Sequence, residues 1–126
     1  ILNIREKKEL PVYGDGKNIR DWLFVEDHVR AIEAIFLHKT LGEVYNIGGG
    51  YETTNLALVK RLIALVDARL GRPEGASLSL IEFVADRLGH DFRYAIDATK
   101  LRTSIGWTPQ VSFEEGLRKT VDWYLR

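Results

Sequence analysis

Cysteine and methionine are both missing from this 126-residue sequence. Without cysteine there is no disulfide, no thiolate metal site and no cysteine nucleophile. Net charge is also missing, because 18 basic residues balance 18 acidic ones, and this removes the global electrostatic argument for nucleic acid or a membrane surface as a partner. No apolar run is long enough to span a bilayer, and no secretory signal is recognisable. We therefore expect a cytoplasmic protein that binds neither nucleic acid nor membranes.

The chain is expected to be part of a longer protein. It begins with Ile1 rather than methionine, and an initiator methionine is normally removed only before a small residue. Apolar residues make up 45% and charged residues 29% of the chain, which is typical of a globular domain rather than a disordered segment. No repeat, low-complexity tract or internal boundary divides it, so residues 1–126 are expected to form one region.

Alternating strand and helix patterns predict an α/β fold. A strand fragment is expected at residues 10–13, and Pro11 places it at a sheet edge. Further strands are expected at residues 19–25, 44–47 and 80–84. Helices are expected at residues 27–38, 56–70 and 97–106 and from residue 113 onward. The expected N-cap residues are Asp27, Asn55, Asp97 and Ser112, the last within a capping box. These strands are too few for a covered sheet, which again indicates that a partner region is missing.

The three glycines at residues 48–50 follow a predicted strand and precede a predicted helix, where phosphate-binding loops lie. They lack the dinucleotide fingerprint, because Thr53 occupies the position of its third glycine. Most such stretches are turns that need positive φ. A narrower possibility is that the helix beginning at Asn55 points its unpaired N–H groups at a phosphate.

Two charged segments are candidates for ligand binding. Arg20 beside Asp21 is either a solvated strand end or structural ion pair, or it supplies an arginine fork for a diphosphate. Residues 86–91 concentrate ionisable side chains in one loop, which is either a polar surface loop or a binding loop held by a scaffold. The three histidines are far apart in sequence and no HExxH motif occurs, so no metal site is expected.

Eight short segments together carry a resemblance to a known family. They are LPVYG at 10–14, IRDWLFVEDH at 19–28, YNIGG at 45–49, ADRLGHD at 85–91, RYAID at 93–97, GWTP at 106–109, EGL at 115–117 and TVDWY at 120–124. In this order they resemble the C-terminal part of the NAD-dependent nucleotide-sugar dehydratases and epimerases of the extended short-chain dehydrogenase/reductase family. The segments at 19–28 and 85–97 together point most narrowly to the dehydratases that act on dTDP-glucose.

The resemblance implies that this chain is a truncated substrate-binding lobe. In the family, such a lobe packs against an N-terminal Rossmann half that holds NAD, and the parent protein is expected to be a homodimer. Nine residues would contact the dTDP-sugar: Pro11, Val12 and Tyr13 along the nucleotide, Arg20 and Asn55 at the phosphates, and Asp86, Arg87, Gly89 and His90 in a loop that closes over the nucleotide. Leu88 stands where the family usually has proline, which leaves that loop less rigid.

The same resemblance implies the reaction of the parent protein, the conversion of dTDP-glucose to dTDP-4-keto-6-deoxyglucose in deoxysugar (rhamnose) biosynthesis. In the family, NAD takes a hydride from C4 of the sugar, water leaves across C5 and C6, and the hydride returns to C6. The tyrosine–lysine pair and the acidic pair that drive these steps lie upstream, so no catalytic or NAD-binding residue is expected in this chain, which alone would be inactive. Two alternatives stay open: a lobe of another nucleotide-sugar epimerase or decarboxylase, and a non-catalytic binding module.

Overall fold

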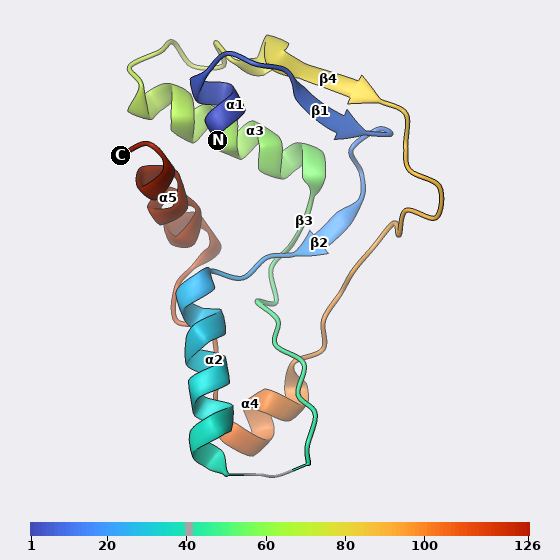
Figure 1. The fold of residues 1–126 in the computed structure, drawn as a ribbon, viewed down its shortest axis with the longest axis vertical. Coiled ribbons are helices and arrows are strands. Elements are labelled where there is room, and N and C mark those ends of the chain that lie inside the picture. The colour runs from blue at the N-terminus through green and yellow to red at the C-terminus, as the bar shows by residue number, and fades with distance from the viewer. Residues whose placement is uncertain (40–41) are drawn as a thin grey trace.

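The computed structural model describes residues 1–39 and 42–126 and has an elongated α/β shape (Figure 1). Its elements in chain order are α1 (Leu2–Arg5), β1 (Leu10–Tyr13), β2 (Ile19–Asp21), α2 (Val25–His38), β3 (Glu52–Thr54), α3 (Asn55–Arg69), the 3₁₀ helix η1 (Leu78–Leu80), β4 (Ile81–Val84), α4 (Thr99–Ile105) and α5 (Phe113–Tyr124). The predicted α/β class and the predicted long helices are confirmed.

Two small sheets connect these elements. β1 and β4 pair in parallel, with Leu10 beside Ile81, whereas β2 and β3 pair antiparallel, with Arg20 opposite Thr53. Both strands of a two-stranded sheet are edge strands, which is the position that Pro11 predicts. Because β1 and β4 run in the same direction, the segments that follow their carboxyl ends begin at the same edge of the sheet.

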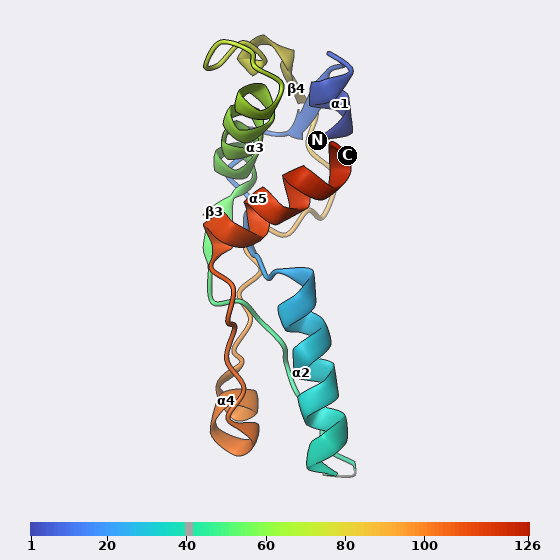
Figure 2. The same cartoon turned by 90° about the vertical axis from the view of Figure 1, so that its left-hand side faces the viewer.

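Two separate apolar clusters hold the two ends of the molecule. The first joins α1, α3 and α5 and is centred on Ile4, Ile63, Val66 and Val121. The second joins α2 and α4 and is centred on Ala31, Leu101 and Trp107, and this helix pair extends away from the rest of the fold (Figure 2). Because both clusters are small, large apolar side chains stay exposed outside them, including Phe36 on α2 (80% exposed) and Trp123 on α5 (64% exposed).

Two of the predicted strands are wrong in part or in full. β2 ends at Asp21 and α2 begins at Val25, so only the first half of the strand expected at 19–25 is formed. The strand expected at 44–47 does not form, and the segment that pairs with β2 is β3 at 52–54. The apolar composition of both segments predicted strands. The path of the backbone depends instead on a tertiary contact, which composition does not reveal.

That contact is made by the carboxylate of Asp21. It accepts hydrogen bonds from the backbone N–H groups of Gly49 (2.8 Å) and Tyr51 (2.9 Å). The backbone of Gly49 lies so close to Trp22 that a Cβ there would collide with the Trp22 carbonyl oxygen. Asp21 therefore holds a stretch of backbone that is close-packed at Gly49. The prediction of a turn that needs positive φ applies here only to Gly50, which has a φ of +68°.

Asp27 is not the N-cap of α2, which is Phe24, with no side-chain cap. It lies inside the first turn and is fully buried. Its carboxylate accepts hydrogen bonds from the backbone N–H groups of Gln110 (3.1 Å) and Val111 (2.9 Å) and from Arg30 (3.1 Å). A buried carboxylate needs such partners, and here they tie α2 to the segment that precedes α5.

The N-cap of α3 also differs from the prediction, because it is Thr54 rather than Asn55. The Thr54 hydroxyl accepts a hydrogen bond from the N–H of Ala57 at 3.2 Å. At α5, by contrast, Ser112 is the N-cap as predicted, and its hydroxyl accepts from the N–H of Glu115 at 3.3 Å. A cap of this kind satisfies one of the N–H groups that a helix start leaves without an intrahelical partner.

The N-terminus of α4 is one residue away from its predicted position. The N-cap is Ala98, although the Asp97 carboxylate still accepts a hydrogen bond from the N–H of Thr99 at 2.9 Å. At the other end Gly106 has a φ of +77°, the left-handed conformation that a glycine at a helix C-terminus adopts without strain. None of the helices within the described part of the chain has the length and apolarity to cross a membrane.

Candidate functional site

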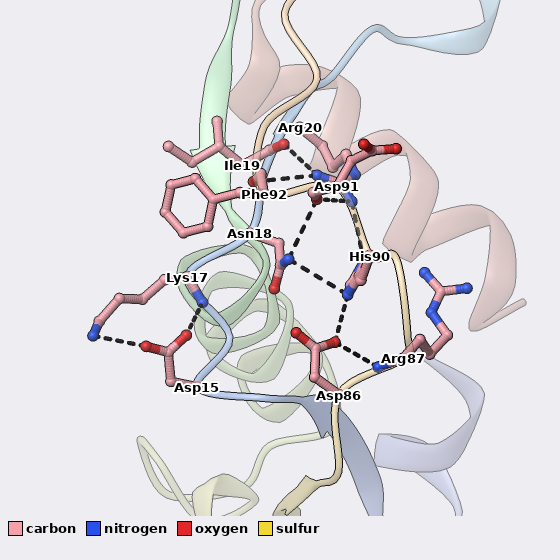
Figure 3. A network of polar contacts seen from close by, with 10 residues as sticks. All are labelled: Asp15, Lys17, Asn18, Ile19, Arg20, Asp86, Arg87, His90, Asp91 and Phe92. Atoms are coloured by element: carbon pink, nitrogen blue, oxygen red, sulfur yellow. Dashed lines mark hydrogen bonds and ion pairs between the residues drawn. The ribbon is translucent and has the colours of Figure 1, made fainter.

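The candidate site lies where β2 meets the segment that follows β4 (Figure 3). The backbone of Ile19 donates to the Phe92 carbonyl (2.8 Å) and accepts from the N–H of Tyr94 (3.0 Å). These bonds hold residues 86–92 beside β2. The loop begins directly after β4, so it also lies next to Tyr13 at the end of β1.

Arg20 is half-buried on β2, and its guanidinium is surrounded by the loop. Its Nη1 donates to the carbonyl of Ile19 at 2.6 Å, and its Nη2 donates to the carbonyl of Asp91 at 2.9 Å. The same Nη2 lies 3.1 Å from Nε2 of His90. The guanidinium also lies over the ring of Tyr94, 4.8 Å from its centroid. Arg20 therefore faces the loop and is not paired with its neighbour in sequence, Asp21.

His90 and Asp86 form the next link of this network (Figure 3). His90 Nδ1 lies 2.6 Å from the Asp86 Oδ1, and the backbone N–H of Arg87 donates to the same oxygen at 2.8 Å. The hydrogen bond with His90, more than any other contact, holds the pKa of the Asp86 carboxyl below its ordinary value. The imidazole is nearly buried, with only 6% of its side chain exposed.

Arg87 projects from the loop toward β1, where its guanidinium lies 5.0 Å from the centroid of the Tyr13 ring. The same ring forms a T-shaped pair with the His90 ring, with 6.1 Å between centroids and an angle of 81° between the ring planes. A cation over an aromatic face is attracted by the ring quadrupole. Leu88, at the position where a proline was expected, is fully exposed at the tip of the loop, and Gly89 has a φ of +70°, which only glycine adopts readily.

One residue of this network, Asn18, was missed by the sequence reasoning. Its side chain is 5% exposed, and its Nδ2 lies 3.4 Å both from the Asp91 carbonyl and from Nδ1 of His90. Its backbone carbonyl accepts from the N–H of Asn55 at 2.9 Å. Asn18 thus connects the loop with the start of α3. In the sequence Asn18 follows Gly14 and Gly16, a composition typical of a turn that gives no sign of a buried amide.

The start of α3 does not offer free N–H groups to a phosphate. The N–H of Asn55 donates to Asn18, that of Leu56 donates to the Gly16 carbonyl at 3.0 Å, and that of Ala57 donates to its cap. The expectation of unpaired N–H groups at this helix start is therefore wrong. The half-buried side chain of Asn55 makes no hydrogen bond within residues 1–39 and 42–126, so the side chain is the part of this residue available to a ligand.

The remaining predicted residues lie on β1. Pro11 is exposed, Val12 is 4% exposed, and Tyr13 is 42% exposed. A ligand at this edge can therefore meet the Tyr13 ring, but only main-chain atoms of Val12. Within the described residues, no three side chains able to ligate a metal come together.

A mostly apolar cavity of about 940 Å³ lies away from this network, between α3, α5 and the segment before α2. Its lining includes Trp22, Phe24, Leu58, Phe113 and Trp123, and none of the nine predicted residues. The indole Nε1 of Trp22 is buried without a hydrogen-bond partner in the described part of the chain. This cavity and the charged network are therefore two different features.

Solved structures with this fold define the class of protein. The chain is similar to a dTDP-glucose 4,6-dehydratase from Bacillus anthracis in complex with NAD, with 49% identity and a TM-score of 0.82, over 98% of this chain and 37% of that one. It is also similar to the UDP-glucose 4-epimerase of Thermotoga maritima, with 32% identity and a TM-score of 0.75, over 98% and 37%. The fold is that of the extended short-chain dehydrogenase/reductases, as predicted.

Sequence comparison narrows this class. The family model described as GDP-mannose 4,6 dehydratase matches residues 1–120, so the chain belongs to that family. Among the curated relatives, the dTDP-glucose 4,6-dehydratase of Neisseria gonorrhoeae is 55% identical over 99% of this chain. The dTDP-glucose 4,6-dehydratase 1 of Escherichia coli strain K12 is 50% identical, also over 99% of this chain. The chain spans just over a third of the length of these relatives, 37% and 34% respectively.

Proposed function

We propose that this chain is the substrate-binding lobe of an NAD-dependent dTDP-glucose 4,6-dehydratase and that it grips the dTDP part of the substrate. The observation that carries this proposal is the network beside the carboxyl ends of β1 and β4. There Arg87 and His90 lie beside the Tyr13 ring, and Arg20 on β2 contacts His90. Cationic and hydrogen-bonding groups next to an exposed aromatic ring suit a nucleoside diphosphate. The high identity to named dehydratases supports the choice of dTDP-glucose.

The two arginines would hold the diphosphate in different ways. The two terminal nitrogens of Arg20 already form hydrogen bonds with backbone carbonyls and with His90. Its Nε has no hydrogen-bond partner among the described residues. A phosphate would accept from this Nε and displace part of the existing set. The Arg87 guanidinium forms no ion pair or hydrogen bond with any residue that the structure describes, and it lies over Tyr13. It can therefore bind a phosphate without losing a hydrogen bond.

The other predicted residues complete the proposed grip. Tyr13 and the adjoining main chain of β1 would lie along the nucleotide, and the Asn55 side chain would donate to a phosphate oxygen. Gly89 allows the tight turn that brings His90 back toward β2. Holding the remote dTDP group fixes the position of the sugar, which lowers the entropic cost of reaching the transition state in the rest of the enzyme.

NAD does not fit the residues described here. Asp21 accepts from the N–H groups of Gly49, within the glycine stretch, and of Tyr51 just after it, and the N–H groups at the start of α3 have protein partners. We therefore place the NAD site and the catalytic residues outside this chain, in an N-terminal Rossmann half. The exposed apolar side chains of α2 and α5 support such a missing partner. A homodimeric, cytoplasmic parent enzyme is part of the same proposal.

Replacement of Arg20 tests the proposal. In the intact natural protein, Arg20→Ala should weaken dTDP binding at least tenfold, because a charged hydrogen bond contributes about 1.5–3 kcal/mol. Arg118→Ala, which removes an exposed arginine of α5, is the matched control and should leave affinity unchanged. Titration calorimetry measures the affinity of each variant for dTDP and for UDP. An Arg20→Ala protein that is folded and binds dTDP as tightly as the natural one would remove Arg20 from the site.

A further inference from the structure

The imidazole of His90 lies between a cation and an anion in the candidate site. Its Nε2 is 3.1 Å from Nη2 of Arg20, and its Nδ1 is 2.6 Å from Oδ1 of Asp86. The ring is held from both sides and is almost excluded from water, with 6% of the side chain exposed. Both ring nitrogens are therefore committed to neighbours whose hydrogen-bonding roles are known.

These roles fix the position of the ring proton. A guanidinium has donors only, so Nε2 of His90 has to be the acceptor in its contact with Arg20. The single proton of the neutral ring then lies on Nδ1, where the carboxylate of Asp86 accepts it. The amide Nδ2 of Asn18 is also 3.4 Å from Nδ1, but this contact is much longer than the 2.6 Å contact with Asp86, and the same amide donates one of its two hydrogens to the Asp91 carbonyl.

The other charged groups around the ring do not change this assignment. The carboxylate of Asp91 accepts from the Tyr94 hydroxyl at 2.5 Å, so the Asp91 carbonyl, and not its charge, faces Arg20 and Asn18. On β1, the Tyr13 ring forms a T-shaped pair with the imidazole. The Arg87 guanidinium lies over that same tyrosine ring. One carboxylate on the Nδ1 side and one guanidinium on the Nε2 side thus define the surroundings of His90.

We infer that His90 is a positioning residue for Arg20: it is held as the neutral Nδ1–H tautomer and accepts a hydrogen bond from the guanidinium, and it takes up a proton from solvent when a diphosphate binds. The inference rests on the proposed function for its ligand. A protonated Nε2 cannot accept from Arg20, so the hydrogen bond between the two groups is lost and both become donors toward one anion. The diphosphate supplies the negative charge that keeps the two cations together.

The first test needs no ligand. In the intact protein labelled with ¹⁵N-histidine, the ring resonances of His90, assigned by their loss in His90→Gln, should show the proton on Nδ1 near neutral pH. This pattern supports the inference. A proton on Nε2 in the ligand-free protein overturns it, because Arg20 would then face a second donor.

The second test measures proton uptake on binding. Calorimetry with dTDP in two buffers of different ionisation enthalpy should show a proton taken up by the natural protein near neutral pH, and affinity should rise as the pH falls, by at most about tenfold per pH unit for one linked proton. The variant His90→Gln keeps an acceptor for Arg20 but cannot be charged, so it should lose this uptake. The protonation state of free dTDP at a given pH is the same in both titrations, so it does not distinguish the two proteins.

His28→Gln is the matched control, because His28 is exposed on α2 and outside the network. It should retain the proton uptake of the natural protein. Equal uptake in the natural protein and in His90→Gln overturns the inference, while a dTDP affinity that still depends on Arg20 leaves the proposed function standing. Failure of the folded natural protein to bind dTDP would overturn the proposed function, and the tautomer measurement would then still decide the assignment of the ring proton.

Discussion

Replacement of Asp27 by asparagine should destabilise the fold far more than its position on a surface helix suggests. The carboxylate of Asp27 is fully buried and serves three donors: the backbone N–H groups of Gln110 and Val111, and Arg30. Asparagine keeps the shape of the side chain but replaces one acceptor oxygen by an NH₂ group. At least one of the three donors then faces another donor.

The cost follows from the contacts that are lost. A hydrogen bond to a charged group contributes about 1.5–3 kcal/mol, and a buried donor left unsatisfied costs about 1–3 kcal/mol. Relaxation recovers part of this sum, so we expect Asp27→Asn to lower the free energy of unfolding by about 2–4 kcal/mol. The effect should appear as a separation of α2 from the segment before α5, because Asp27 joins these two.

The neighbouring residue provides the control. Glu26 is exposed and pairs with the same arginine, Arg30, at 3.5 Å, so Glu26→Gln should change the free energy of unfolding by less than about 1 kcal/mol. Urea unfolding followed by circular dichroism measures both variants. If Asp27→Asn is already unfolded in water while Glu26→Gln is folded, the loss of unfolding free energy is at or above the upper end of the expected range, and the prediction is confirmed. Equal unfolding midpoints for the two variants would refute it.

Two further predictions concern local contacts. Thr54→Ala should cost about 1 kcal/mol of stability because it removes the N-cap bond to Ala57, whereas Asn55→Ala should cost clearly less; the reverse order in urea unfolding would contradict the cap assignment. The lowered pKa of Asp86 means that its contact with His90 stabilises the loop above the ordinary aspartate pKa of about 4 and is lost as pH falls below that value. A carboxyl NMR titration of Asp86 at its ordinary value would exclude this contact.

Elements with local signals were predicted well. The short strand predicted at 10–13, which Pro11 placed at a sheet edge, matches the observed bounds of β1. Ser112 caps α5 and Gly106 ends α4, because caps depend on residues within one turn of the helix end. At residues 19–25 and 44–47 the apolar composition was misleading, since the path of the backbone there depends on the carboxylate of Asp21, which acts on residues 28 and 30 positions away.

In the candidate site, too, features that depend on residue type were predicted and features that depend on distant contacts were not. Residue type alone marked Arg20, Arg87 and His90 as candidates, and the resemblance to a family gave them a shared ligand. Their hydrogen-bond partners could not be predicted, because each partner comes from another part of the chain. Asn18 was missed for this reason: in sequence it is a turn residue, and in space it connects the loop with the start of α3.

By itself the sequence determined the α/β class, the positions of the long helices and the family resemblance, because these depend on residue type and on spacing within short segments. The tertiary structure alone decided that the N–H groups at the start of α3 are occupied and that Asp21 serves the glycine turn. It alone also placed His90 between Arg20 and Asp86. The physical reason is that a hydrogen bond needs two groups within about 3 Å, and only the folded chain brings groups so far apart in sequence to that distance.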